Sequence, residues 1–108
     1  MSNWSTGANA EKKYIEMLVA KGFKPEWIRR FPKTKFYSQD FFGVDIVALN
    51  CGRMICIQVK SCKDRFPSLD KKTRRQLTRL FYQLPLSGEV YWAGYNRKLK
   101  RWREIKIE

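Results

Sequence analysis

Two apolar runs near the middle of the chain give the clearest structural signal. The first is GVDIVAL (43–49) and the second is MICIQVKS (54–61), and both are rich in β-branched residues. The NCGR segment between them has the Asn and Gly chemistry of a hairpin turn. Because each run is almost continuously apolar, the pattern predicts strands covered on both faces, as in a sheet with helices packed against it.

The flanking segments predict the other strands. EWIRRF (26–31) predicts a short strand that ends at Pro32, and a polar, basic loop, KTKFYSQDF (33–41), follows it. Towards the C-terminus, EVYWAGYN (89–96) and RWREIKIE (101–108) predict a closing hairpin around the basic turn RKLKR.

Two helices are expected from apolar positions spaced at the helical period. ANAEKKYIEMLVAKGF (8–23) predicts the first, with Thr6 or Asn9 as its N-cap and Gly22 closing its C-terminus. SLDKKTRRQLTRLFYQL (68–84) predicts the second. Its core stripe follows i, i+3, i+4, i+7 spacing and consists of Leu77, Leu80, Phe81 and Leu84.

The order of these elements predicts the fold class. A helix, three strands, a helix and two strands form a small α/β domain with a mixed central β-sheet flanked by helices. A chain of 108 residues is large enough for one modest core and too small for two, so we expect a single domain over 1–108.

The charge balance changes the picture from fold to function. Lys and Arg total 23 against 10 acidic residues, a net charge of +13. Charge of that size opposes compaction, which favours a polyanionic partner, with nucleic acid ahead of an anionic membrane surface or a virion interior. The cations are spread along the chain, which predicts a folded basic face. The candidates for DNA contacts are Arg29, Arg30, Lys33, Lys35, Lys63, Lys71, Arg75 and Arg79.

One subset of these cations has a regular spacing. Lys71, Arg75 and Arg79 fall at i, i+4 and i+8 of the second predicted helix. The row fits phosphate contacts, and it fits equally well an ordinary solvated helix surface.

Composition also removes whole classes of chemistry. The sequence has no histidine and no CxxC motif, which excludes zinc fingers and histidine-based nucleophile arrangements. The cysteines, Cys51, Cys56 and Cys62, are odd in number, which argues against a disulfide framework. No run reaches the roughly 18 apolar residues of a membrane span, and the N-terminus lacks signal-peptide features. We therefore expect a cytoplasmic protein, nucleoid-associated or in the host cytoplasm if viral.

Polar residues inside the apolar runs mark a candidate site. Gln58 and Lys60 point to the same face of their predicted strand, because side chains alternate along a strand. If the two runs pair, Asp45 approaches both laterally. On the first helix, Glu11 falls inside the apolar arc while Glu16 lies on the polar side. A carboxylate on a packed face needs a cation or a metal.

This donor set favours a hard divalent cation. Carboxylate and amide oxygens without histidine or thiolate select Mg²⁺ or Mn²⁺. Such an ion lowers the pKa of a bound water and neutralises a scissile phosphate, and an adjacent lysine orients the attacking water. The reaction indicated is metal-dependent hydrolysis of a phosphodiester.

At these residues the sequence resembles the PD-(D/E)XK nucleases, and within them the archaeal-type Holliday junction resolvases. The matching segments are GANAEKKYIEMLVAKGF, DIVAL and CIQVKS, in the family's order over most of residues 7–84. The resemblance implies a restriction-endonuclease-like fold and a homodimer that cuts opposed strands of a four-way DNA junction. By position it implies three metal ligands, a catalytic lysine and two further polar site residues: Glu11, Asp45 and Gln58, then Lys60, then Ser38 and Gln76.

Gln58 departs from the family pattern, which has Glu or Asp there. An amide oxygen still binds Mg²⁺, but it adds no charge and cannot act as a base. Two alternatives therefore stay open. One is a nuclease of the same fold that acts on flaps, nicks or single-strand ends. The other is a non-catalytic DNA-binding protein that kept the fold. Either way, Asp45 and Lys60 also have plainer interpretations, as a turn residue and as a snorkelling strand-end lysine.

Overall fold

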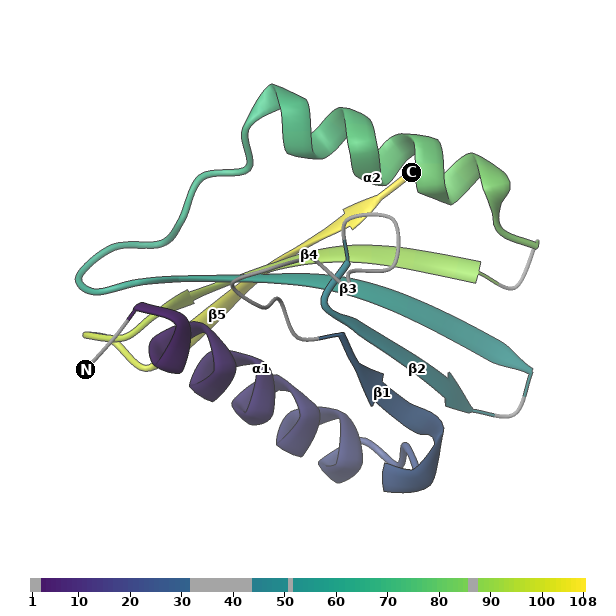
Figure 1. The fold of residues 1–108 in the computed structure, drawn as a ribbon, viewed down its shortest axis with the longest axis horizontal. Helices are drawn as coiled ribbons and strands as arrows, with labels where there is room; N and C mark the ends of the chain where they lie inside the picture. The colour runs from purple at the N-terminus through teal and green to yellow at the C-terminus, as the bar shows by residue number, and fades with distance from the viewer. Residues whose placement is uncertain (1–2, 32–43, 51, 86–87) are drawn as a thin grey trace.

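The computed structural model describes residues 3–31, 44–50, 52–85 and 88–108, with side chains from Asn9 onward. The elements follow the predicted order (Figure 1): α1 (Asn3–Ala20), a 3₁₀ turn η1 (Pro25–Trp27), β1 (Ile28–Arg30), β2 (Ile46–Asn50), β3 (Arg53–Cys62), α2 (Lys71–Gln83), β4 (Gly88–Asn96) and β5 (Arg101–Ile107).

The strands form one mixed sheet whose spatial order follows the sequence, β1-β2-β3-β4-β5. Neighbouring strands are antiparallel except β3 and β4, which are parallel and are joined through α2. The two helices lie on opposite faces of this sheet (Figure 1). The predicted mixed α/β domain and its αβββαββ order are therefore confirmed.

Two predicted boundaries are wrong. The first helix begins at Asn3 and continues through Thr6 and Asn9, so neither of those residues is its N-cap. Once a helix is nucleated, each added residue costs little, so small polar residues extend it as readily as they cap it. The first strand begins only at Ile28, because Pro25 at the first position of η1 favours a tight turn over an extended chain.

Gly22 closes α1 as the sequence predicts. Its φ is +103°, in the left-handed region that favours glycine. The Phe23 N–H donates to the Leu18 carbonyl at 3.1 Å and the Gly22 N–H to the Val19 carbonyl at 3.0 Å, the pair of bonds of a Schellman motif. Phe23 thereby turns back under the helix and joins the core beside Leu18.

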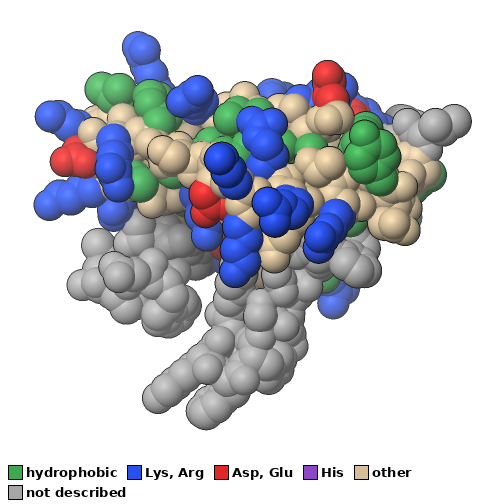
Figure 2. All heavy atoms as spheres, turned by 90° about the horizontal axis from the view of Figure 1, so that it is seen from above, with side chains coloured by type: hydrophobic (Ala, Val, Ile, Leu, Met, Phe, Trp, Pro, Cys, Tyr) green, Lys and Arg blue, Asp and Glu red, His purple; other side chains and the backbone are tan. Residues whose placement is uncertain are grey.

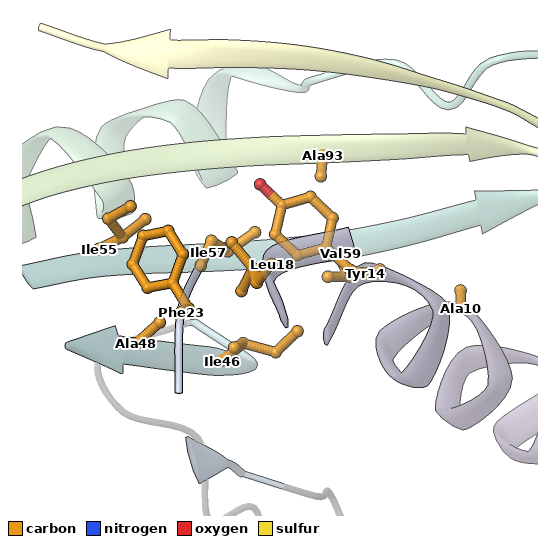
Figure 3. Packing of buried hydrophobic residues seen from close by; sticks show 10 residues of the cluster. All are labelled: Ala10, Tyr14, Leu18, Phe23, Ile46, Ala48, Ile55, Ile57, Val59 and Ala93. Atoms are coloured by element: carbon orange, nitrogen blue, oxygen red, sulfur yellow. The ribbon is translucent and has the colours of Figure 1, made fainter. Parts of the chain in front are cut away.

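Strand β3 is buried on both faces, as its continuous apolar pattern predicts. On one side, residues of β2, β3 and β4 pack against α1 (Figure 3), in a cluster of Ala10, Tyr14, Leu18, Phe23, Ile46, Ala48, Ile55, Ile57, Val59 and Ala93. On the other side, Leu77 and Leu80 of α2 pack against Val44, Cys56, Val90, Trp92 and Ile107. The predicted stripe of α2 therefore faces the core, with Phe81 and Leu84 at its margin.

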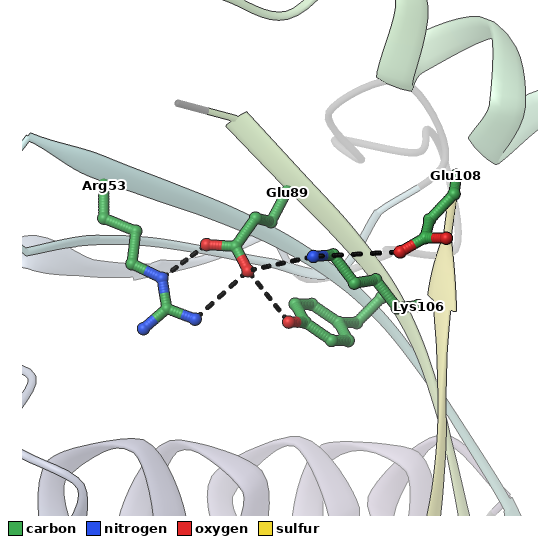
Figure 4. A network of polar contacts seen from close by, with 5 residues as sticks. Arg53, Glu89, Lys106 and Glu108 are labelled. Carbon is green, nitrogen blue, oxygen red and sulfur yellow. Dashed lines mark hydrogen bonds and ion pairs between the residues drawn. The ribbon is translucent and has the colours of Figure 1, made fainter. Parts of the chain in front are cut away.

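A polar network joins the starts of β3 and β4, at the end of the sheet opposite the β3–α2 connection. Glu89 at the start of β4 accepts hydrogen bonds from both Nε and Nη2 of Arg53, the latter at 3.1 Å (Figure 4). It also accepts a bond of 2.9 Å from the Tyr91 hydroxyl, and Lys106 lies 3.9 Å away. The Arg53 bonds, followed by the Tyr91 bond, lower the pKa of Glu89 from 4.5 to about 2.

This network makes a prediction about acid stability. Because the folded pKa of Glu89 is about 2 and its ordinary value is 4.5, its stabilisation is present above pH 4.5 and is lost as pH falls towards 2. Glu89→Gln should lower the free energy of unfolding by about 1–2 kcal/mol at neutral pH, a figure reduced for the exposure of Arg53. Urea titrations across this pH range should show the difference from wild type shrinking as the solution becomes acidic.

Glu108→Gln is the matched control for this measurement. The Glu108 side chain is 75% exposed and forms an ion pair with Lys106 at 3.9 Å, so its removal should change stability by less than about 0.5 kcal/mol at any pH. A Glu89→Gln deficit that stays constant down to pH 2 would contradict the assignment.

Candidate active site

Asp45 is fixed in place immediately before β2. Its N–H donates to the Ile57 carbonyl at 2.9 Å, and its own carbonyl accepts the Phe31 N–H at 2.8 Å. Its carboxylate oxygen Oδ2 accepts the Val59 N–H at 2.8 Å, and the residue is only 4% exposed. These bonds hold the carboxylate against β3 at the level of Gln58. The turn interpretation of Asp45 is therefore incomplete, because its side chain is directed into the sheet end.

Gln58 is 5% exposed and follows Ile57, which pairs with Ile46, the residue after Asp45. It shares the α2 side of the sheet with Cys56, since Ile57 and Val59 face α1. Within the described part of the chain, its Oε1 atom is buried and has no hydrogen-bond partner. An orphaned acceptor costs about 1–3 kcal/mol, so it calls for a ligand such as a cation or a bound water.

Lys60 continues the same row two residues later and is exposed at the end of β3. It reaches the start of α2, where Asp70 is the N-cap and accepts the Thr73 N–H at 2.6 Å. That bond lowers the pKa of Asp70, and the positive charge of Lys60 lowers it further. The ammonium therefore lies within electrostatic reach of the α2 N-terminus, on the solvent side of Gln58.

Glu11 reaches the same end of the sheet from α1. Its side chain is 16% exposed, and Arg30 Nε lies 3.6 Å from its carboxylate. Arg30 pairs in register with Ile46, the residue after Asp45. Tyr14, one turn further along α1, donates its hydroxyl to Glu104 at 3.3 Å and anchors the helix to β5. Glu11 lies on the apolar face of α1, where a carboxylate needs a cation, and Arg30 supplies one. Glu16 is exposed, as predicted.

The proposed metal ligands Glu11, Asp45 and Gln58 would each offer an oxygen atom, but they do not form a cluster of three acidic side chains. Among the described residues, no three Asp, Glu or Cys side chains come together in a way that could hold a metal ion. Two features account for this: position 58 supplies an amide in place of a carboxylate, and Glu11 comes from α1, on the opposite face of the sheet from Gln58.

The structure places the predicted DNA contacts unevenly. Arg29, Lys63 and the α2 row Lys71, Arg75 and Arg79 are exposed, and Figure 2 shows Lys and Arg side chains spread over the face that carries α2. Arg30 is half-buried and ion-paired with Glu11, so it is not a free phosphate contact in this conformation. Gln76 is exposed on α2. Ser38, Lys33 and Lys35 lie outside the described residues.

The aromatic side chains of β4 belong to the packed sheet. Trp92 and Tyr95 are buried and Tyr91 is half-buried, so they do not offer open faces for stacking bases, whereas Trp27 and Tyr82 are exposed. Burial raises the pKa of the Cys56 thiol to about 11, which makes it an inert core residue. Cys62 is half-buried and unpaired, and Cys51 lies outside the described residues.

Sequence reasoning missed two features at this end of the sheet. The Arg30–Glu11 pair depends on the β1–β2 register, and no local pattern encodes it. The basic turn after β4 was assigned only a connecting role, although four cations in five residues (97–101) are a readable signal. Among the described helices, none has the length and hydropathy needed to cross a bilayer.

Comparison with known proteins identifies the fold. No protein-family model matches the sequence, and no curated protein matches it significantly. Among solved structures, the chain is similar to Hjc, a Holliday junction resolvase from the archaeal hyperthermophile Archaeoglobus fulgidus. The TM-score is 0.68 at 24% sequence identity, over 94% of this chain and 73% of that chain. The likeness confirms the resolvase-like fold expected from the motifs.

Proposed function

We propose that this protein is a metal-dependent endonuclease that resolves four-way DNA junctions by phosphodiester hydrolysis. The observation that carries the proposal is the buried Asp45 carboxylate, bonded to the Val59 N–H next to Gln58, whose buried Oε1 has no partner among the described residues, with Lys60 next in the same row of β3. The likeness of the fold to that of a Holliday junction resolvase supports a branched DNA substrate, and the net charge of +13 agrees with it.

The residues present fit a hard divalent cation, Mg²⁺ or Mn²⁺. Asp45 and Gln58 would hold it. Glu11, which comes from the α1 face and is paired with Arg30, would join them only by leaving Arg30 and reaching the ion around the end of the sheet. The buried Oε1 of Gln58 would then gain the partner that it lacks. When bound, such an ion lowers the pKa of a water molecule and offsets charge on the scissile phosphate.

The side chains of the chain itself supply the rest of the chemistry. Lys60, exposed two residues beyond Gln58 on β3, orients the attacking water and offsets charge that develops on the phosphate. The row Lys71, Arg75 and Arg79 binds the backbone of an arm, which positions the scissile bond without reading sequence. A junction requires two cuts in opposed strands, so the active species is a homodimer with one site in each copy.

Cleavage of defined substrates tests the proposal. Labelled four-way junction, flap, nicked duplex, single-strand end and plain duplex are incubated with Mg²⁺, Mn²⁺ or EDTA. Metal-dependent cutting of the junction ahead of the others is expected. If flaps or ends are cut in preference, the protein is a nuclease with a different substrate. If no substrate is cut, the nuclease function is refuted. Calorimetric titration with Mg²⁺ alone reports on the ion site without reference to activity.

The Gln58→Glu variant separates a nuclease from a non-catalytic DNA-binding protein. A carboxylate at this position adds a charge to the donor set, so the Mg²⁺ concentration at half-maximal activity should fall about tenfold. In EDTA the same charge is buried, with the Asp45 carboxylate bonded to the N–H of the next residue, Val59, so burial and repulsion between the two carboxylates should lower the melting temperature. Melting curves with and without Mg²⁺ measure both effects.

Gln83→Glu is the control for this variant, because Gln83 is exposed at the end of α2 and the substitution changes charge equally. It should leave the metal dependence unchanged. Activity that appears in Gln58→Glu and is absent from wild type would favour the non-catalytic interpretation, which the Glu11–Arg30 pair also supports.

A further inference from the structure

The turn between β4 and β5 is a concentrated basic feature of the described surface. Four of its five residues from Arg97 to Arg101 are Lys or Arg, and all five are exposed. Within the described part of the chain, none of these four cations has a carboxylate within ion-pair distance. Four uncompensated charges on one short turn repel each other, which favours a site for a polyanion.

The turn is held in one conformation. Asn96 is 3% exposed, and its Oδ1 accepts the N–H groups of Lys98 at 3.0 Å and Leu99 at 3.1 Å. The Arg97 N–H donates to the Cys62 carbonyl at 3.0 Å, which fastens the base of the turn to β3. Lys100 has a φ of +54°, a left-handed conformation that costs a lysine roughly 1 kcal/mol more than a glycine. The surface is therefore preorganised before any ligand binds.

The turn also lies at the active-site end of the sheet. In the parallel pair, Lys60 is level with Gly94, and Cys62 is level with Asn96 at the base of the turn. Figure 1 shows the turn at the same end as the segment that leaves β3 for α2. At 3.3 Å per strand residue, its tip is about 10 Å beyond Lys60, or roughly three nucleotides along a strand.

Leu99 adds an exposed apolar side chain to this basic turn. Its side chain is 53% exposed at the tip, between two lysines. An isolated exposed leucine needs no explanation, but a leucine held on a rigid turn and flanked by cations matches the apolar wedges that proteins insert between base steps. Insertion costs a few kcal/mol in a stacked duplex and less where bases are already unstacked, as at a branch point.

We infer that the β4–β5 turn is a second DNA-contacting element, in which the cations bind phosphates and Leu99 inserts at the unstacked steps of branched DNA. The inference rests on the proposed function, because it takes DNA as the ligand. It adds a source of selectivity for branches that is separate from the residues of the cleavage chemistry.

Two matched charge variants test the phosphate contacts. Lys98→Gln with Lys100→Gln removes two charges from the turn, and Lys21→Gln with Lys24→Gln removes two from exposed positions at the far end of α1. Binding is measured in EDTA by fluorescence anisotropy over a salt series. The turn pair should weaken junction binding about tenfold near 0.1 M salt and reduce the salt slope by about two, and the control pair should stay within about twofold of wild type.

Leu99→Ala tests the wedge against Leu49→Ala, which truncates another exposed leucine, 40% exposed on β2. The ratio of junction to duplex affinity should fall about fivefold for Leu99→Ala and remain unchanged for Leu49→Ala. With 2-aminopurine at the branch point, wild type should raise the fluorescence and Leu99→Ala should not. Equal melting temperatures confirm that every variant is folded.

The outcomes separate this inference from the proposed function. Turn variants that bind like their controls overturn the inference, even if the protein cuts junctions normally. Loss of binding confined to the turn variants supports it, even if no substrate is ever cut. Because binding is measured in EDTA, failure of the cleavage chemistry does not affect the result.

Discussion

Asp45→Asn is expected to lower the rate of junction cleavage by at least about a thousandfold, equivalent to about 4 kcal/mol of transition-state stabilisation. Asparagine has the same shape and its amide oxygen still accepts the Val59 N–H bond, so the β2–β3 pairing should persist. What it removes is the buried negative charge that is proposed to hold the cation with Gln58. Single-turnover cleavage at saturating Mg²⁺ measures the effect.

DNA binding provides the internal control for Asp45→Asn. Removal of a negative charge from a basic surface should leave junction affinity unchanged or slightly increased. Mg²⁺ titration of the free protein should show weaker binding. A variant that cuts within about tenfold of wild type would remove Asp45 from the chemistry and with it the proposed site.

Lys60→Ala is expected to reduce the rate about a hundredfold or more, the usual cost of removing one positioned donor from a charged transition state. Because the ammonium is exposed at the end of β3, truncation should cost little stability. Lys60→Arg should recover only part of the rate, since a planar guanidinium does not reproduce a compact ammonium. Rates at saturating junction separate this effect from a loss of affinity.

The control for Lys60 is Lys21→Ala, which removes an equally exposed lysine from the far end of α1. Its saturated rate should match that of wild type. If Lys60→Ala also cuts at the wild-type rate once the junction is saturating, its role is limited to binding.

The fold was largely predictable because burial on both faces leaves a continuous apolar pattern, as in β3. The Gly22 stop of α1 was predictable for a different reason, since a left-handed residue after a helix has a strong glycine preference. The start of α1 was not, because its polar residues serve as helix interior and as cap with little difference in energy. The sequence predicted β1 to be longer than it is, because Pro25 favours a 3₁₀ turn over an extended chain.

Along β3, Ile57 and Val59 face α1 and Cys56 faces α2, so strand alternation puts Gln58 and Lys60 on the α2 side, while the Asp45 carboxylate is bonded to the Val59 N–H. The partner of Glu11 could be predicted only as a type, a cation, because its identity depends on which residue of β1 lies beside β2. The unpartnered state of the Gln58 oxygen is likewise a property of the packed structure. From the sequence alone, a glutamine in an apolar run fits a buried side chain with satisfied hydrogen bonds as well as it fits a metal ligand.

The sequential strand order has a consequence for solubility. It leaves β1 and β5 as the two edges of the described sheet, where unpaired backbone groups invite edge-to-edge growth into fibrils. Strand β1 is three residues long, and two of them are arginines. Strand β5 exposes Arg101, Arg103 and Lys106. Copies that approached edge to edge would bring like charges together, so these cations protect a concentrated solution from aggregation.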